Sequence, residues 1–190
     1  MMSKTVAREV ISADSAPVAP RYFAHAVFRT PNYQAMIDWY GKVLNAHVVA
    51  GGPMLTFMSF DEEHHRLAFI NQPKLKPVDG SQAGVEHLAY GLGDLAELLN
   101  TYARLKSCDI APVWCVNHGL TISMYFQDPD GNRVELQVDN FDTVEELQGW
   151  FKGAEFAENP IGHSYDPEEL LRLYAAGTPR ADLIRIGFER

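Results

Sequence analysis

The sequence predicts an α+β fold made of two copies of one strand–helix–strands unit, followed by a helical extension. The first observation is a repeat. Shifting the sequence by the interval that separates His25 from His87 aligns the first amphipathic helix with the second. The second is composition, because 190 residues that are 46% hydrophobic and 22% charged suffice for a folded domain with a substantial core. We expect one domain over residues 21–141, with modules at about 21–75 and 84–141.

Composition also excludes several classes of protein. The chain has 16 lysines and arginines against 25 aspartates and glutamates, a net charge of −9, which argues against a nucleic-acid partner. No apolar run approaches the roughly 18 residues that span a membrane. Residues 1–20, which we interpret as a flexible N-terminal arm, lack the apolar segment of a secretory signal. Cys108 and Cys115 form no CxxC pair and no disulfide framework. We therefore expect a cytoplasmic protein that acts on a small molecule, with no membrane and no nucleic acid as a partner.

The first unit is expected to begin with a strand over residues 21–28, which are rich in aromatic and β-branched side chains. Thr30 as N-cap and Pro31 at the first helical position then predict a helix. The apolar face of this helix consists of Met36, Trp39, Tyr40, Val43 and Leu44. Two apolar runs joined by an acidic turn, at 54–60 and 65–70, predict the strands that follow.

The second unit repeats this order. Residues 84–90 predict a strand, and Asp94 with Glu97 forms a capping box that opens the second helix. The apolar face of this helix consists of Leu95, Leu98, Leu99, Tyr102 and Leu105. A strand near 112–116 and a hairpin over 120–138 complete the unit. From the residues alone, a chance recurrence of two amphipathic helices remains an alternative to a true repeat.

The hairpin is the most informative local feature. Residues 127–132, Gln-Asp-Pro-Asp-Gly-Asn, predict a type I turn closed by a left-handed glycine. In this register Asp128 lies opposite Asn132, so Tyr125 and Glu135 become cross-strand neighbours on one face of the sheet. A plain two-residue turn would shift the register by one residue and point Tyr125 away.

The histidines raise the possibility of a metal site. A lone histidine on a strand is more often structural, but His25 and His87 occupy equivalent places in the two units. If the units pack around a pseudo-twofold axis, both converge on one point, where Glu135 would supply a carboxylate. Two histidines and one carboxylate on one face, with open positions, are typical of non-haem Fe(II) oxygenases.

Three segments carry a resemblance to a known family. Residues 22–25 (Tyr-Phe-Ala-His), 38–44 (Asp-Trp-Tyr-Gly-Lys-Val-Leu) and 126–135 (Phe-Gln-Asp-Pro-Asp-Gly-Asn-Arg-Val-Glu) resemble the vicinal oxygen chelate superfamily, which includes glyoxalases, bleomycin resistance proteins and dioxygenases. Within it, residues 61–69 and 117–119 resemble the type I extradiol ring-cleaving dioxygenases, here in a one-domain form. The resemblance covers about residues 21–141.

The resemblance implies two βαβββ modules whose mixed sheets form a cup around a divalent metal. It places the metal ligands at His25, His87 and Glu135. It also places the acid/base histidine at His65, a tyrosine beside the metal at Tyr125, and a histidine that supports the site or binds substrate at His118. His64 and His65 are expected to alternate along a strand, so only one of them faces the cup. Periodicity favours neither residue, and the resemblance selects His65.

The function implied by the resemblance is extradiol cleavage of a catechol-type substrate with both atoms of O₂ at Fe(2+), although Mn(2+) accepts the same ligands. A homo-oligomer is expected, with a dimer favoured. One alternative is a metal-independent small-molecule or antibiotic-binding protein on the same fold, which would not need the three ligands. Another is a glyoxalase-like isomerase, which would want a fourth ligand where residues 67–70 are apolar.

The extension, residues 142–190, lies outside the resemblance. Val144, Leu147, Trp150 and Phe151 lie at helical spacing, and Asp166 with Pro167 opens a further helix. The segment carries more apolar surface than a free tail would. We expect it to pack over its own cup or over that of a partner, the alternative being that it thickens the core away from the site.

Overall fold

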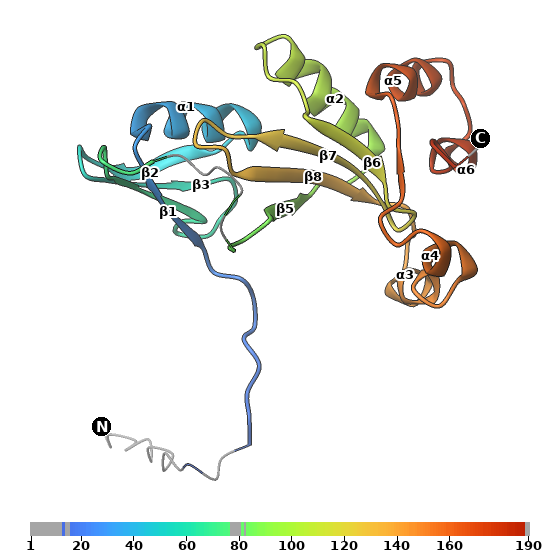
Figure 1. Cartoon of the computed structure of the whole chain (residues 1–190), viewed down its shortest axis with the longest axis horizontal. Coiled ribbons are helices and arrows are strands. Elements are labelled where there is room, and N and C mark those ends of the chain that lie inside the picture. The colour runs from blue at the N-terminus through green and yellow to red at the C-terminus, as the bar shows by residue number, and fades with distance from the viewer. Residues whose placement is uncertain (1–12, 14–15, 77–80, 82, 189–190) are drawn as a thin grey trace, which may run out of the picture.

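The computed structural model describes residues 13, 16–76, 81 and 83–188. It contains two mixed sheets, with helices α1 and α2 on the same side of them (Figure 1). The predicted α+β class is therefore confirmed. Of the predicted N-terminal arm, residues 1–12 and 14–15 lie outside the described residues, whereas residues 16–20 are exposed and form neither helix nor strand.

The first module is a four-stranded sheet covered by one helix. Its elements are β1 (Ala26–Thr30), α1 (Tyr33–Val43), β2 (His47–Gly51), β3 (Leu55–Ser59) and β4 (Leu67–Asn71). The strand order is β1-β4-β3-β2, in which β1 runs parallel to β4 and the other pairs are antiparallel. Strand β2, which was not predicted, is an edge strand with every residue exposed.

The second module has the same topology, so the predicted repeat is real. Its elements are β5 (His87–Gly91), α2 (Leu95–Lys106), β6 (Trp114–Asn117), β7 (Thr121–Gln127) and β8 (Arg133–Asp139). The order is β5-β8-β7-β6-β9, where β9 (His163–Ser164) comes from the C-terminal extension, and β5 is parallel to β8. As predicted, Asp94 caps α2 by accepting a hydrogen bond from the Glu97 amide at 2.9 Å.

The β7–β8 hairpin has the predicted register. The Asp128 amide donates to the Asn132 carbonyl at 2.9 Å, and Tyr125 pairs with Glu135. Gly131 has φ +93°, the left-handed conformation that closes this type of turn. The Asp128 carboxylate also accepts hydrogen bonds from turn amides, including that of Asn132 at 2.9 Å, which fixes the turn and hence the register.

A shared hydrophobic core and hydrogen bonds between polar side chains hold the two modules together. Met36 and Tyr40 from α1, Phe69 from β4, and Leu98 and Leu99 from α2 are buried in one hydrophobic cluster. The Tyr40 hydroxyl donates to the Asp128 carboxylate at 3.1 Å. The Asn32 side-chain amide donates to the Asp130 carboxylate at 2.8 Å. The hairpin turn of the second module is thereby bonded to the helix of the first.

Two predicted boundaries at the start of the domain are wrong. The first strand begins at Ala26 rather than at residue 21, and α1 begins at Tyr33 rather than after a Thr30 cap. Thr30 is the last residue of β1, and its hydroxyl accepts the Asn32 amide at 2.9 Å. That bond forms a tight turn before the helix, so Asn32 takes the N-cap position.

The C-terminal extension wraps around the β6 edge of the second sheet. Its elements are α3 (Val144–Trp150), α4 (Ala154–Glu158), β9, α5 (Pro167–Ala175) and α6 (Arg180–Leu183). Helices α3 and α4 lie at one end of the sheet, and α5 lies beside α2 (Figure 1). Within the described part of the chain, no helix is long and apolar enough to cross a membrane.

Candidate metal centre

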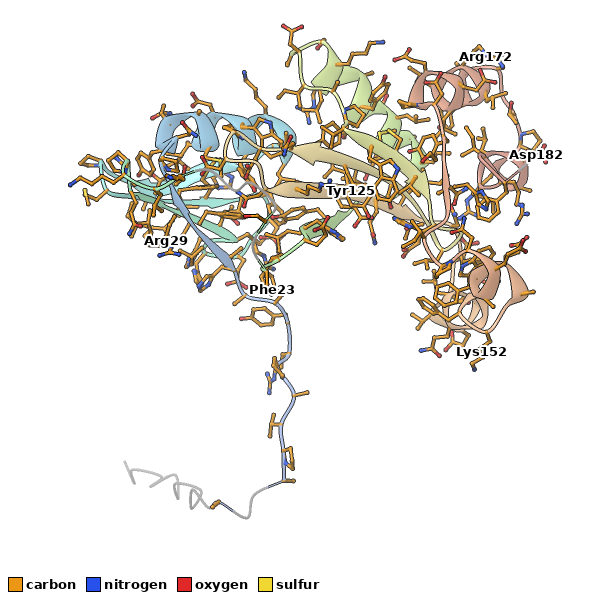
Figure 2. All side chains as sticks on the ribbon, in the orientation of Figure 1. Phe23, Arg29, Tyr125, Lys152, Arg172 and Asp182 are labelled. Atoms are coloured by element: carbon orange, nitrogen blue, oxygen red, sulfur yellow. The ribbon has the colours of Figure 1, made fainter. Side chains whose placement is uncertain are left out.

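The side chains of the candidate site lie on the sheet face that α2 does not cover. Met124 and Leu136 are buried in the hydrophobic cluster with α2. Because side chains alternate along a strand, Tyr125 and Glu135 point to the opposite face. Figure 2 places Tyr125 within the second sheet. The pairing of β7 with β8 therefore selects which residues face the site.

Glu135 and His87 are in direct contact. His87 begins β5, Glu135 lies on the neighbouring strand β8, and the His87 Nε2 atom is 2.9 Å from the Glu135 Oε2 atom. Glu135 is only 3% exposed. A carboxylate that is this buried requires a positive or hydrogen-bonding partner, and here the partner is an imidazole.

Tyr125 lies against the same pair. Its ring stacks on Trp114 at 4.9 Å between centroids and meets the edge of His87 at 5.2 Å. Burial, followed by the negative charge of Glu135, raises the pKa of the Tyr125 hydroxyl above its usual value of 10. The hydroxyl is therefore protonated at neutral pH and acts as a hydrogen-bond donor.

His118 completes this cluster from the loop between β6 and β7. Its Nε2 atom lies 3.0 Å from the Tyr125 hydroxyl and 3.9 Å from the Glu135 Oε1 atom. Its Nδ1 atom lies 2.5 Å from the carbonyl oxygen of Ile161, in the C-terminal extension. The structure thus brings His87, Glu135, Tyr125 and His118 together.

The other two predicted site residues lie together in the first module. His25 immediately precedes β1, and its ring centroid is 4.5 Å from that of His65. The Nδ1 atoms of His64 and His65 are 2.6 Å apart, a distance that requires one of them to donate a hydrogen bond to the other. Desolvation, followed by the proximity of His64 and His25, lowers the pKa of His65 from 6.5.

The expected alternation of His64 and His65 along a strand is wrong, because β4 begins at Leu67. The Asp61 carboxylate accepts the Glu63 amide at 3.1 Å and the Arg66 Nε–H at 2.9 Å. These bonds keep the chain in a turn through both histidines. A turn allows neighbouring side chains to face the same way, which a strand does not.

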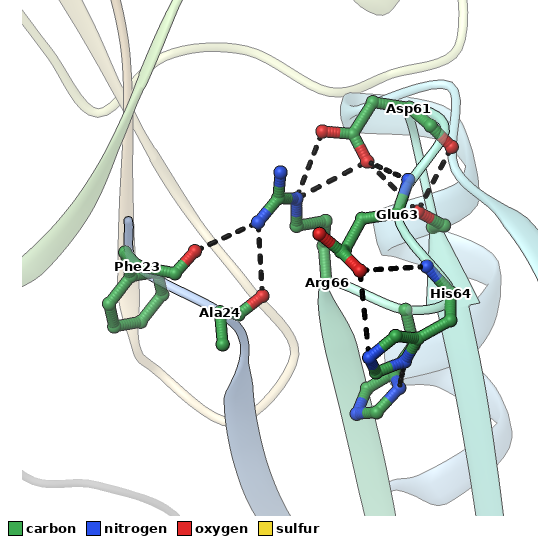
Figure 3. Close-up of polar contacts among 8 residues, drawn as sticks. Phe23, Ala24, Asp61, Glu63, His64 and Arg66 are labelled. Atoms are coloured by element: carbon green, nitrogen blue, oxygen red, sulfur yellow. Dashed lines mark hydrogen bonds and ion pairs between the residues drawn. The ribbon is translucent and has the colours of Figure 1, made fainter. Parts of the chain in front are cut away.

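Arg66, which was not among the predicted site residues, anchors the chain that leads to His25. Its Nη1 atom donates to the carbonyls of Phe23 at 2.8 Å and Ala24 at 3.2 Å, as Figure 3 shows. The Asp61 carboxylate holds the same guanidinium by its Nε. No residue pattern points to this contact, because the acceptors are backbone carbonyls that every residue carries.

A pocket lies where the two modules meet. It has a volume of about 460 Å³ and is lined by Tyr22, Phe23, Phe60, Asp61, Arg66, Leu88, Ala89, Tyr90 and Gly91. His25 follows Phe23 by two residues, and His87 directly precedes Leu88. The segments that carry these two histidines therefore border the same pocket.

The chemistry of the donor set fits a divalent transition metal. Imidazole nitrogens with one carboxylate are a ligand set for iron and manganese, and Glu135 and His87 already meet at a hydrogen-bonding distance. Among the residues that the structure describes, however, no three histidine, cysteine or acidic side chains are gathered closely enough to hold a metal ion. His25 contacts His65 instead. The three-ligand set of His25, His87 and Glu135 therefore stays a prediction.

The sequence and fold place this chain in a family. Residues 22–136 match the Glyoxalase/Bleomycin resistance protein/Dioxygenase superfamily, and the chain belongs to it. A glyoxalase/dioxygenase structure from Nostoc punctiforme has the same fold, with a TM-score of 0.55 at 20% identity over 66% of this chain and 97% of that one.

Two curated relatives are much more similar in sequence, and both are from Rhodococcus globerulus. Biphenyl-2,3-diol 1,2-dioxygenase 2 is 48% identical over 158 residues, which cover 83% of each chain. Biphenyl-2,3-diol 1,2-dioxygenase 3 is 42% identical over 168 residues, which cover 87% of this chain and 88% of that one. These alignments are long enough to include part of the C-terminal extension or of the N-terminal segment as well as the domain.

Proposed function

We infer that this protein is an extradiol dioxygenase that opens a catechol-type aromatic ring with O₂. The observation that carries the inference is the contact between His87 and Glu135, on the uncovered face of a fold whose close relatives are named as dioxygenases of an aromatic diol.

We propose that His87, Glu135 and His25 hold Fe(2+). A bound divalent iron would supply a positive centre with open positions for two adjacent phenolic oxygens and for dioxygen. For His25 to join the other two ligands, its ring would move toward His87 and Glu135, because the three side chains are not gathered closely enough to hold an ion in the part of the chain that the structure describes. The apolar character of Leu67, Ala68 and Phe69, all buried, supports a three-ligand site over a glyoxalase-like four-ligand one.

Two side chains of this protein, His65 and Tyr125, would respectively accept a proton and donate a hydrogen bond during the reaction. His65, whose pKa is lowered, is mostly neutral near pH 7 and can accept a proton from a phenolic hydroxyl. Tyr125, whose pKa is raised, keeps its single hydroxyl hydrogen, and it can donate this hydrogen in a hydrogen bond to a substrate oxygen instead of to His118 Nε2, which lies 3.0 Å away. Tyr22, Phe23, Phe60 and Tyr90 line the pocket between the modules and offer aromatic contacts to the substrate ring.

The test is a direct assay of the iron-loaded protein. After anaerobic loading with Fe(2+), oxygen uptake and product absorbance are followed with biphenyl-2,3-diol, with catechol, and with 2-hydroxybiphenyl as a control that has only one hydroxyl. We expect one O₂ consumed per diol cleaved and no consumption with the monophenol. A protein that holds one iron per chain and consumes no oxygen with either diol would contradict the proposal.

A further inference from the structure

The C-terminal extension contacts the site through one turn, residues 159–163, which we call the tail turn. Its Ile161 carbonyl oxygen lies 2.5 Å from His118 Nδ1. A carbonyl oxygen has no hydrogen to donate, so the hydrogen of this bond belongs to Nδ1. A neutral imidazole carries a single ring hydrogen, so the other nitrogen, Nε2, which lies 3.0 Å from the Tyr125 hydroxyl, is then left as an acceptor.

The position of the Ile161 carbonyl is fixed within the tail turn itself. The Asn159 Oδ1 atom accepts the amides of Ile161 at 3.2 Å and Gly162 at 3.1 Å. The Asn159 side-chain amide donates in turn to the Gly162 carbonyl at 2.7 Å. These three bonds close the turn and leave the Ile161 carbonyl free to face His118.

The tail turn is also fixed against the loop that carries His118. Strand β9 pairs with β6, and His163 lies opposite Asn117. Asn117 is fully buried, and its side-chain amide donates to the carbonyls of Ile184 at 2.8 Å and Ile186 at 3.0 Å. The residue that precedes His118 is thus held by two separate segments of the extension.

Close approach of the two backbones depends on Gly162. Its φ is +97°, and a Cβ at this position would lie 2.2 Å from the Asn117 carbonyl oxygen and 2.7 Å from the His118 Cα. Real Cβ atoms do not approach backbone atoms so closely, so any other residue would push the tail turn away from His118.

We propose that the tail turn is a positioning element that selects the Nδ1–H tautomer of His118 through the Ile161 carbonyl. His118 then presents Nε2 as an acceptor 3.0 Å from the Tyr125 hydroxyl. The tautomer assignment stands on geometry alone, whereas its effect on turnover rests on the proposed dioxygenase function. Hydrogen-bond partners of this kind typically contribute 10- to 100-fold to activity at metal sites.

The experiment compares two glycine substitutions in the full-length chain. Gly162→Ala introduces the clash, whereas Gly177→Ala changes another positive-φ glycine of the extension, with φ +77° and no atom within 4 Å of its Cβ. Long-range ¹H–¹⁵N correlation spectra of the ¹⁵N-histidine-labelled, metal-free protein identify which ring nitrogen of His118 carries the proton. We expect Nδ1–H in the wild type and in Gly177→Ala, and loss of that single tautomer in Gly162→Ala.

A second variant keeps the test decisive if Gly162→Ala does not fold. Asn159→Ala removes the acceptor that holds the tail turn, without any added atom, and should also populate the Nε2–H tautomer. In the iron-loaded enzyme, either variant should lower kcat about 10- to 100-fold with a smaller change in KM. A wild-type His118 with its proton on Nε2, or an Nδ1–H tautomer that survives in the folded variants, would overturn the proposal. Because the spectra need no turnover, failure of the dioxygenase assay leaves this result interpretable.

Discussion

The hydroxyl of Tyr40 donates a hydrogen bond to the carboxylate of Asp128, and this bond joins the helix of the first module to the hairpin turn of the second. Both residues are buried, at 0% and 5% exposure. The same turn sets the register that pairs Tyr125 with Glu135. Asp128 therefore contributes both to the contact between the modules and to the strand register that arranges the site.

Tyr40→Phe should destabilise the protein by about 1 to 2 kcal/mol, because a buried hydrogen bond to a carboxylate is lost while the ring packing is kept. The free energy of unfolding is measured by urea denaturation. Tyr174→Phe, which removes an exposed hydroxyl, is the control and should be close to neutral. Equal midpoints for Tyr40→Phe and wild type would mean that the bond adds nothing to stability.

The proposed metal ligands can be tested by iron content. His87→Ala and Glu135→Ala should each abolish bound iron while leaving the fold intact, because a three-ligand site has no spare protein ligand. His25→Ala should do the same, because His25 is the third proposed ligand. His47→Ala, at an exposed histidine on the edge strand β2, should keep stoichiometric iron. Iron that survives in all three ligand variants would remove these residues from the site.

His65→Gln should retain iron but lower turnover by about 10² to 10⁴, the usual contribution of a general acid or base. His64→Gln is the matched control, since it alters the neighbouring ring in the same turn. Steady-state oxygen uptake and iron analysis on both variants separate proton transfer from metal binding. An inactive His64→Gln beside a fully active His65→Gln would reverse the assignment of the two histidines.

The extension should unfold together with the domain. Leu170, on α5, is fully buried in the hydrophobic cluster, so Leu170→Ala should cost about 2 to 5 kcal/mol. Leu75→Ala, at an exposed leucine, is the control and should cost far less. Thermal unfolding followed by circular dichroism should show one transition, shifted to a lower temperature in Leu170→Ala. A separate early transition for the extension would show that it is an independent unit.

Local chemistry made the hairpin and the second helix predictable from sequence. The Pro-Asp-Gly turn determines the Tyr125–Glu135 register, and the Asp94 cap needs only residues within one helical turn. The turn at His64 and His65 was missed because the Asp61 carboxylate, rather than hydrophobic alternation, decides where β4 begins.

Contacts to backbone carbonyls could not be predicted at all. The acceptors of Arg66 and His118 are carbonyl oxygens of Phe23, Ala24 and Ile161, and such atoms have no residue-specific pattern. Strand β2 was missed for a different reason, because a short exposed edge strand has no buried face to produce alternation.

The pairing of β9 with β6 has a consequence for the order in which the protein matures on the ribosome. The four strands β5 to β8 are complete once residue 139 has been synthesised, but the fifth strand of that sheet arrives only with His163 and Ser164. Until then His118 has no Ile161 carbonyl to fix its ring. The nascent chain thus contains all four of these strands and Glu135 before it contains the carbonyl that orients His118, so the orientation of this histidine is among the last features of the site that can form.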